Sequence, residues 1–420
     1  MLHRRRFLGA AAAGAASLVL PHRLARAEVS ATDRKFIFVF NPGGWDPTRV
    51  FAPTFDTPVV AMEPAAQRGR AGGIDFVDHP DRPSVRAFMT QHHDRMLVIN
   101  GVQVRSIAHE ICTMITLTGN TSGLTPDWAT IIAASGGTGL TLPHLILGGP
   151  SFTGALATSS ARTGAAGQLE GLLSGDLSES SDQPVGRLPL PYTDRIDDFL
   201  LRRSRAEAFG ARGDAQAALT DAYDDALSKA LGLKDFRWVM DFTGGTGLAD
   251  QAQVAADALR LGLSRCVSLA HTGGGTGWDT HAQNDETQSV LFEGLFNGLG
   301  QLMEVLRTTP GARGGPLADE TVVVVLSEMG RTPGLNGTAG KDHWPYTSMM
   351  ILGDGLTGDR VVGGFDASYA GVPLDPSTAE VSSPAPVLSV ESVGAALLEL
   401  AGVDADAWTS GTTPLRGVLS

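Results

Sequence analysis

The chain has few cysteines, few aromatic side chains and no long uninterrupted apolar run. Only two of its 420 residues are cysteines, Cys112 and Cys266, so a disulfide-rich scaffold is excluded. One bridge between them is permitted, but both lie in apolar runs, which favours two small buried core residues. After residue 27, no segment reaches the roughly 18 uninterrupted apolar residues that a membrane-spanning helix needs. We therefore expect no stable membrane span in the mature chain.

Positive charge is also scarce. The sequence has 32 lysines and arginines against 45 aspartates and glutamates, which gives a formal net charge of −13. An acidic surface of this kind argues against nucleic acid and against anionic lipid headgroups as partners.

The N-terminus has the pattern of an export signal. Arg-Arg-Arg-Phe-Leu at 4–8 is a twin-arginine motif, an Ala/Gly-rich run follows at 9–20, and Ala-Arg-Ala at 25–27 is a small-x-small cleavage site. We expect residues 1–27 to be removed and the twin-arginine translocase to be a partner during export. The mature chain would then be periplasmic or extracellular. An uncleaved N-terminal anchor is the alternative, because a signal cannot report its own cleavage.

Short apolar runs alternate with helical patterns along the rest of the chain. Runs rich in Val, Ile and Phe, continuous rather than alternating, predict strands buried on both faces. They lie at 35–40, 96–100, 266–271, 321–327 and 349–352. Apolar residues spaced by three and four predict helices at 250–261, 283–308 and 390–401. This order favours an α/β fold in which helices cover both sides of a mainly parallel sheet.

The middle of the chain differs in composition. Residues 151–183 are rich in Gly, Ser, Ala and Thr, and residues 192–231 are charged with a helical pattern. We interpret about 151–235 as an insertion into a single domain that spans 28–420. It could form a lid over the site, or a surface loop followed by a packing helix pair.

Acidic and imidazole side chains follow several of the predicted strands. In open α/β sheets chemistry collects beyond the carboxyl ends of the strands, so these positions carry extra weight. Asp, Glu and His are the side chains that bind zinc or a harder divalent ion. The candidate ligands are Asp46, Asp279, His281, Glu328, Asp342 and His343. Arg331 follows Glu328 closely and is a candidate clamp for an anionic group.

The nucleophile of such a site has no clear motif. It should follow the strand at 96–100, where Ser106, Thr113 and Thr118 are hydroxyl candidates, and a metal-contacting hydroxyl would lose its proton more readily. His109 and Glu110 lie in the same segment, and His109 could be a further ligand or an acid–base group. Each hydroxyl could equally be a helix cap or a solvated turn residue. His271 could be either a ligand or a hydrogen-bonded core histidine.

Several motifs together resemble one family. They are the twin-arginine signal, Gly-Gly-Trp-Asp at 43–46, Trp-Asp-Thr-His at 278–281, Ser-Glu-Met-Gly-Arg-Thr at 327–332 and Asp-His at 342–343. This combination resembles the domain-of-unknown-function 1501 family over essentially the whole mature chain. That family is similar in turn to the sulfatase and alkaline phosphatase superfamily. The resemblance implies a three-layer α/β/α sandwich and a one- or two-metal site that hydrolyses phosphate or sulfate esters.

The resemblance also assigns residues, with two departures. Asp279, His281, Asp342 and His343 match the superfamily's metal ligands in type and order. Asp46 matches the carboxylate after the first strand, and Glu328 is a further candidate. Superfamily members often have Asp-x-x-x-His where this chain has Asp-x-His at 279–281, so the coordination could differ. No Cys/Ser-x-Pro-x-Arg sequence exists here, which argues against a formylglycine-dependent sulfatase.

These observations lead to two hypotheses. The first is an exported metal-dependent hydrolase that acts on a phosphate or sulfate-type ester of a small molecule, glycan or lipid. Zinc is the first candidate ion, although the ligand types are also compatible with Mn, Ca or Mg. The second is a non-catalytic cell-envelope binding or assembly protein that keeps the hydrolase fold, because no clear nucleophile is present. A buried salt-bridge network is the alternative explanation for the acid–imidazole groups.

Overall fold

A computed structural model describes residues 29–136, 139–163, 190–210, 213–234, 247–273 and 277–420. The predicted signal at 1–27 lies outside these residues, as does 164–189 of the predicted insertion.

An eight-stranded sheet forms the centre of the molecule, with strand order β12-β4-β11-β8-β1-β7-β5-β6. Its strands are β1 Lys35–Phe40, β4 Met96–Gln103, β5 His144–Ile146, β6 Ser160–Arg162, β7 Cys266–Ala270, β8 Thr321–Leu326, β11 Tyr346–Leu352 and β12 Arg360–Gly363. Only β11 runs antiparallel to its two neighbours, β4 and β8, while all other paired strands are parallel. The predicted mainly parallel sheet is therefore confirmed.

The continuous apolar character of the strands follows from burial on both faces. In β1, Ile37 and Val39 point into one core, whereas Phe36, Phe38 and Phe40 point into the other. Successive side chains of a strand alternate between the faces of a sheet, so both sets must be apolar when helices cover both sides.

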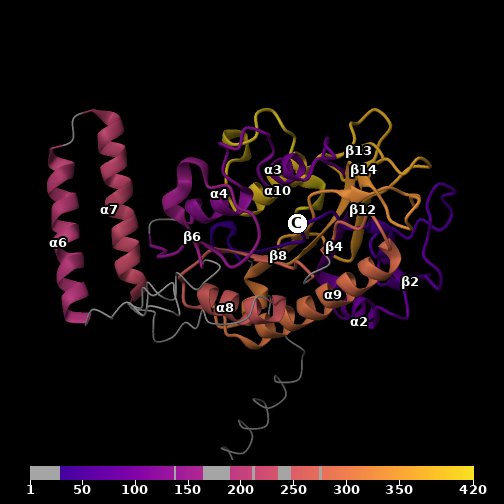
Figure 1. Ribbon diagram of the computed structural model, residues 1–420, viewed down its shortest axis with the longest axis horizontal. Helices are drawn as coiled ribbons and strands as arrows, with labels where there is room; N and C mark the ends of the chain where they lie inside the picture. The colour runs from indigo at the N-terminus through magenta and orange to yellow at the C-terminus, as the bar shows by residue number, and fades with distance from the viewer. Residues whose placement is uncertain (1–28, 137–138, 164–189, 211–212, 235–246, 274–276) are drawn as a thin grey trace, which may run out of the picture.

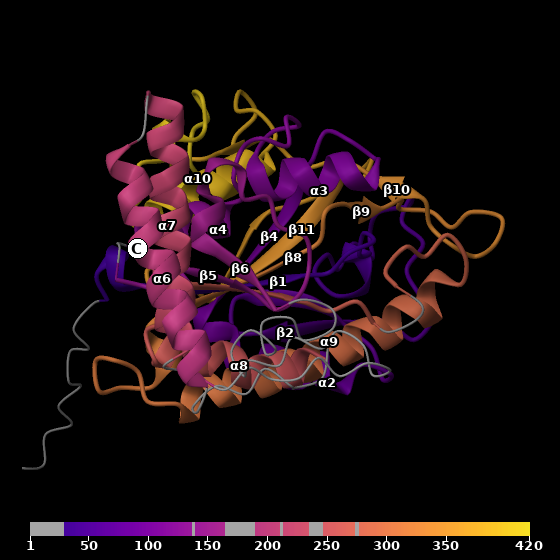
Figure 2. The same ribbon diagram turned by 60° about the vertical axis from the view of Figure 1, so that its left-hand side comes forward.

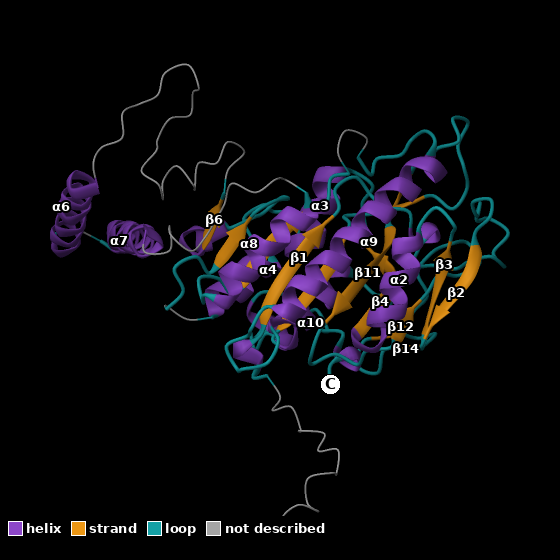
Figure 3. Ribbon diagram, turned by 90° about the horizontal axis from the view of Figure 1, so that it is seen from below, coloured by secondary structure: helices purple, strands orange, loops and turns teal. Residues whose placement is uncertain are grey.

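Two layers of helices enclose the sheet (Figure 1; Figure 3). One core contains side chains of α2 Pro83–His92, α8 Leu248–Arg260 and α9 Asn284–Thr308. The opposite core contains side chains of α3 His109–Thr118, α4 Trp128–Ser135 and α10 Val390–Leu400. The order is helix layer, sheet, helix layer, which confirms the three-layer α/β/α sandwich.

Local sequence signals set several helix ends. The Asp127 carboxylate accepts a hydrogen bond from the Thr130 N–H and caps α4, and Ser389 caps α10 through the Ser392 N–H. Gly119 ends α3 in the left-handed conformation that glycine adopts without strain.

Shorter elements complete the chain. Three two-stranded sheets pair β2 Gln67–Ala71 with β3 Ile74–Asp78, β9 Gly330–Arg331 with β10 His343–Trp344, and β13 Leu374–Asp375 with β14 Glu380–Val381. The short 3-10 helices are η1 Ala31–Asp33, η2 Pro47–Arg49, η3 His93–Arg95, η4 Gly154–Ser159, η5 Leu317–Asp319, η6 Ala405–Ala407 and η7 Arg416–Val418.

The predicted insertion contains a pair of long helices. These are α6 Leu190–Phe209 and α7 Asp214–Lys234, which contact each other and stand beyond β6 at one end of the molecule (Figure 1; Figure 2). Among the described residues, none of the helices is both long and apolar enough to cross a membrane. Cys112 in α3 and Cys266 in β7 are buried and unpaired, as small core residues would be.

Candidate metal centre

The parallel strands β1, β7 and β8 deliver three segments to one edge of the sheet. The loop after β1 contains Gly43, the loop after β7 leads to Asp279, and Glu328 follows β8. Gly43 has a φ of 120°, and a Cβ at this position would lie 2.7 Å from the main-chain nitrogen of Asp279. Only glycine allows the two loops to pack this closely. The edge therefore brings together residues far apart in the sequence, as strand-end chemistry predicts.

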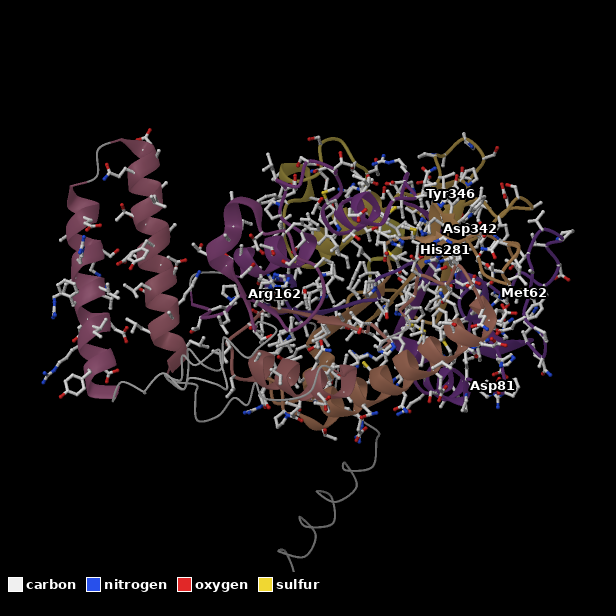
Figure 4. The ribbon with its side chains drawn as sticks, viewed as in Figure 1. Met62, Asp81, Arg162, His281, Asp342 and Tyr346 are labelled. Atoms are coloured by element: carbon white, nitrogen blue, oxygen red, sulfur yellow. The ribbon has the colours of Figure 1, made fainter. Side chains whose placement is uncertain are left out.

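Three imidazoles and one carboxylate converge at this edge. The ligand atoms of His109, Asp279 and His343 all lie within 4.8 Å of one another. An Asp279 carboxylate oxygen lies 3.1 Å from His281 Nε2 and 3.2 Å from His343 Nε2, and the other oxygen lies 3.4 Å from His109 Nε2. We call these four residues the histidine cluster. His281 lies beside Asp342 in Figure 4, at the far side of the molecule from α6 and α7.

Each of the three histidines is held through Nδ1 by an acceptor. His109 Nδ1 lies 2.8 Å from Glu328 Oε1, and His281 Nδ1 lies 3.0 Å from Asp342 Oδ1. His343 Nδ1 lies 2.7 Å from the main-chain carbonyl of Ile107. Carboxylates and carbonyls only accept, so each Nδ1 carries a hydrogen, and a ring without a second hydrogen presents an Nε2 lone pair. All three Nε2 atoms face the Asp279 carboxylate.

This arrangement fits a cation better than it fits three neutral imidazoles alone. His281 Nε2 and His343 Nε2 are only 3.0 Å apart, and the two lone pairs repel unless a cation or a shared proton lies between them. The buried His109 Nε2 has no hydrogen-bond partner among the described residues. A tetrahedral zinc site with bonds of about 2.0–2.1 Å puts neighbouring ligand atoms roughly 3.3 Å apart, close to the distances given above. His109, His343 and Asp279 thus fit a divalent metal, and His281 adjoins them through Asp279 and His343.

The local charges also favour a cation. The hydrogen bond to Glu328 raises the pKa of His109, because the carboxylate stabilises the protonated ring. Burial would raise the pKa of Asp279, but the hydrogen bond and charge of Arg331 outweigh it and lower the pKa to about 2. Asp279 is therefore a carboxylate at neutral pH. The surroundings that favour a proton on His109 favour a metal ion in the same way.

Glu328 and Asp342 differ from their predicted roles as direct ligands. Glu328 is almost fully buried, and its Oε1 accepts hydrogen bonds from His109 and from the Gly43 N–H at 2.8 Å. Asp342 accepts from His281 and, at 3.2 Å, from Asn336. Both carboxylates orient histidines from behind, as carboxylates commonly do in metal sites. His109, predicted as a further ligand or acid–base group, lies in the cluster itself.

Arg331 does not occupy the position of an anion clamp. Its side chain is fully buried, and Nε and Nη1 donate to the carbonyls of Gly44 and Lys341 at 2.8 and 3.1 Å. Nη2 donates to the carbonyls of Gly43 and Trp278 and to Asp279 Oδ1 at 2.5 Å. The guanidinium therefore fixes the loops and Asp279 rather than a bound substrate. Its position corrects the expectation from sequence.

Asp46 lies outside the histidine cluster. Its buried carboxylate is 2.8 Å from Lys341 Nζ and 3.5 Å from Arg49 Nε, and it accepts hydrogen bonds from Thr48 and Asn284. With these partners it serves a buried ionic network, so the structure does not support it as a metal ligand. The alternative of a buried salt-bridge network thus describes Asp46, and for the cluster, where Asp279 also pairs with Arg331, it stays an alternative to metal binding.

A cavity of about 570 Å³ adjoins the cluster. One face of α3 lines it with His109, Glu110, Thr113 and Met114, and Asp279 and Glu328 lie on its wall. Thr113 follows His109 by four residues, so both side chains lie on the same helix face. None of the hydrogen bonds found among the described residues involves the Thr113 hydroxyl. Thr113 therefore has a free hydroxyl beside the cluster, and its predicted role as nucleophile stays a prediction.

Two tryptophans near the cluster in sequence, and His271, belong to the scaffold. Trp278 is fully buried and donates from Nε1 to the His271 carbonyl at 2.8 Å, and Trp344 donates to the Tyr369 carbonyl at 2.8 Å. His271 Nε2 lies 3.2 Å from the Leu291 carbonyl, and burial lowers the pKa of this histidine. It is thus a hydrogen-bonded core histidine.

Sequence patterns missed the main-chain groups of the site. The Ile107 carbonyl and the Gly43 N–H take part through the backbone, which has no side-chain signature. The Gly-Gly pair at 43–44 was the one available signal, because paired glycines mark a close approach of backbone to another group.

The chain belongs to a family described as protein of unknown function (DUF1501), whose model matches residues 33–413. The comparison with curated proteins found no match.

Among solved structures, a candidate sulfatase from Bacteroides thetaiotaomicron is 9% identical, with a TM-score of 0.44 over 92% of this chain and 75% of that chain. A 2-O GAG sulfatase is also 9% identical, with a TM-score of 0.37 over 92% and 75%. The phosphonate monoester hydrolase of Agrobacterium radiobacter is 11% identical, with a TM-score of 0.33 over 88% and 74%. All three TM-scores are below 0.5, so the fold assignment rests on the sheet itself.

Proposed function

We propose that this chain is an exported metal-dependent hydrolase of phosphate or sulfate-type esters, with zinc as the first candidate ion. The observation that supports it best is the convergence of three Nε2 lone pairs and the Asp279 carboxylate, with every Nδ1 hydrogen already engaged. His109, His281, His343 and Asp279 would hold the ion. A bound divalent cation would supply Lewis-acid charge for an ester oxygen.

The chain's own residues would prepare this site in three ways. Glu328, Asp342 and the Ile107 carbonyl hold the rings in the required tautomer. Arg331 keeps Asp279 ionised and in place. Water would attack phosphorus or sulfur while the bond to the ester oxygen breaks, and the proton lost by the water would pass to that oxygen, which leaves as the alcohol. If the Thr113 hydroxyl attacks instead, it would carry the phosphoryl or sulfuryl group until a water molecule hydrolyses this second ester.

Metal content of the purified protein is the first test. Elemental analysis of the wild type after exposure to Zn, Mn, Ca and Mg should find stoichiometric metal, and the His281→Ala, His343→Ala double variant should lose it. His93→Ala is the matched control, because this half-buried histidine contacts Asp359 outside the cluster. A well-folded wild type that stays metal-free would refute the proposal.

Hydrolysis is the second test. A panel of phosphate, phosphonate and sulfate monoesters should reveal turnover that depends on the ion and disappears in the double variant. Thr113→Val and Thr113→Ser then identify the nucleophile. If the Thr113 hydroxyl attacks, Thr113→Val abolishes turnover and Thr113→Ser retains part of it. If water attacks, both variants keep turnover.

A non-catalytic envelope binding or assembly protein is the second candidate. Two observations favour it: the guanidinium of Arg331 is committed to the loops, and no base is hydrogen-bonded to Thr113 among the described residues. Stoichiometric metal without turnover of any ester would favour this candidate over the hydrolase.

Export by the twin-arginine pathway belongs to the same proposal. The variant Arg4→Lys, Arg5→Lys should accumulate in the cytoplasm with residues 1–27 retained, whereas the wild type should be recovered, shortened, outside it. Fractionation followed by N-terminal sequencing measures both properties. Unchanged export of the variant would contradict this part of the proposal.

A further inference from the structure

Given the proposed function, the residues that line the cavity beside the histidine cluster indicate which kind of substrate the site would bind. Asp279, Glu328, one face of α3 and Phe152 all line the cavity. At about 570 Å³ it is large enough for an organic group several carbons long beside the reacting ester.

Much of the wall away from the cluster is apolar. Pro42, Met114 and Phe152 line the cavity. The Phe152 segment is fixed in place, because its N–H donates to Asp127 Oδ2 at 2.7 Å and its carbonyl accepts from the Asp127 N–H at 2.7 Å. Outside the cavity, Ile107 and Leu124 are 56% and 79% exposed on the two loops that flank α3. Such an apolar surface makes more favourable contacts with an alkyl or aryl group than with a sugar.

Apart from His109, the ionisable side chains of the wall are all acidic. Glu110, Asp279 and Glu328 contribute carboxylates, and among the described residues that line the cavity there is no lysine or arginine. Arg331, whose guanidinium contacts Asp279, is buried and donates to four carbonyls and to this carboxylate. A second anionic group on the substrate would thus face Glu110 without a cation to pair with it.

We propose that the substrate is a monoester whose alcohol part is an uncharged alkyl or aryl group, and that polyanionic substrates such as multiply sulfated glycans are excluded. This inference rests on the proposed function only for the position of the ester group at the metal site. Apolar contact with Met114 and Phe152 would bind the alcohol part, and the negative wall would reject further anions.

Binding of alkylphosphonates tests this without requiring turnover. Titration calorimetry with the zinc-loaded protein would compare methyl-, butyl- and octylphosphonate. Each methylene buried should tighten binding roughly three- to fourfold until the cavity is full. A disulfated disaccharide should not compete with octylphosphonate. The double variant Met114→Ser, Phe152→Ser should lose the dependence on chain length while it keeps the affinity for methylphosphonate and the metal content.

The control is Val290→Ser, which alters an exposed apolar residue on α9 that does not line the cavity. It should leave the chain-length series unchanged. Equal affinity for methyl- and octylphosphonate, or competition by the disaccharide, would overturn the inference while the metal site stands. Absence of metal would instead refute the proposed function, and the inference would fall with it.

Glu110→Lys should allow the disaccharide to compete, and failure to do so would also count against the role of the negative wall.

Discussion

Two groups of charged residues lie side by side in this molecule and are built in opposite ways. In the buried network, Asp46 contacts Lys341 and Arg49, and Arg49 also contacts Asp285 at 2.5 Å. In the histidine cluster, three imidazole Nε2 atoms face one carboxylate. Lys341 and Asp342 are neighbours in sequence, yet the lysine is fully buried in the network and the aspartate is exposed beside the cluster.

The difference separates stability from function. Every charge of the network meets an opposite charge or a hydrogen-bond partner, as buried charges must. In the cluster, His281 and His343 place their Nε2 atoms 3.0 Å apart, which costs stability unless a cation or a shared proton lies between them. Substitutions in the network should therefore change folding, and substitutions in the cluster should change metal binding.

The largest expected effect is that of Asp46→Ala on stability. It leaves Lys341 and Arg49 buried without their carboxylate, which should lower the free energy of unfolding by about 3–5 kcal/mol. Denaturant unfolding measures this, with Asp342→Ala as the matched exposed control, for which we expect a change below about 0.5 kcal/mol. Equal losses in the two variants would remove the distinction between network and cluster.

Glu328→Gln should affect metal binding instead. The amide keeps the shape of the side chain but loses the negative charge that orients His109, so metal affinity should fall by about 10–100-fold. Competition with a chelator measures the affinity. Glu293→Gln is the control, because Glu293 also accepts hydrogen bonds at a helix start, from Ser84, but away from the cluster. An unchanged affinity would show that Glu328 does not orient His109.

The network should also determine part of the pH dependence of stability. Burial would raise the pKa of Asp46, but Lys341 and Arg49 hold it well below its ordinary value. A carboxyl with a lower pKa in the folded state stabilises above its unfolded pKa, about 3.9, and loses this contribution as the pH falls towards the folded pKa. The difference in unfolding free energy between wild type and Asp46→Ala should be constant above about pH 5 and shrink below about pH 4. Unfolding curves of both proteins between about pH 2 and pH 7 would measure this difference. A difference that grows in acid would contradict the lowered pKa of Asp46.

The smallest effect is expected for His281→Ala in the absence of metal. The ring is half exposed, and its removal relieves the contact with His343, so the free energy of unfolding should change by less than about 0.5 kcal/mol. With zinc present, the wild type alone should gain stability, because the ion binds only the folded site. Thermal unfolding with and without zinc measures both, and a metal-dependent gain in the variant would contradict the role of His281.

Periodicity predicted the scaffold because it depends on local patterns. The apolar runs at 35–40 and 321–327 became β1 and β8, and the spacing of apolar residues at 283–308 became α9. Candidate residues followed from the rule that chemistry gathers at strand ends, and His281, His343 and Asp279 do lie together.

Their individual roles needed the tertiary structure. The sequence places Asp46 and Asp279 in similar Trp-Asp motifs. In the structure, Lys341 forms an ion pair with Asp46, whereas Arg331 is the one lysine or arginine among the described residues that contacts Asp279. Partners separated by hundreds of residues decide which carboxylate is buried with a cation and which faces imidazoles.

By itself, the sequence determined the class of fold, the family and the set of residue types available for a metal site. The tertiary structure decided that three histidines share one centre, that Glu328 and Asp342 stand behind them, and that Arg331 is enclosed by carbonyls. The physical reason is range: strand and helix periodicity acts between neighbours in the chain, whereas the protonation and orientation of a side chain depend on whatever the fold places within a few ångströms of it.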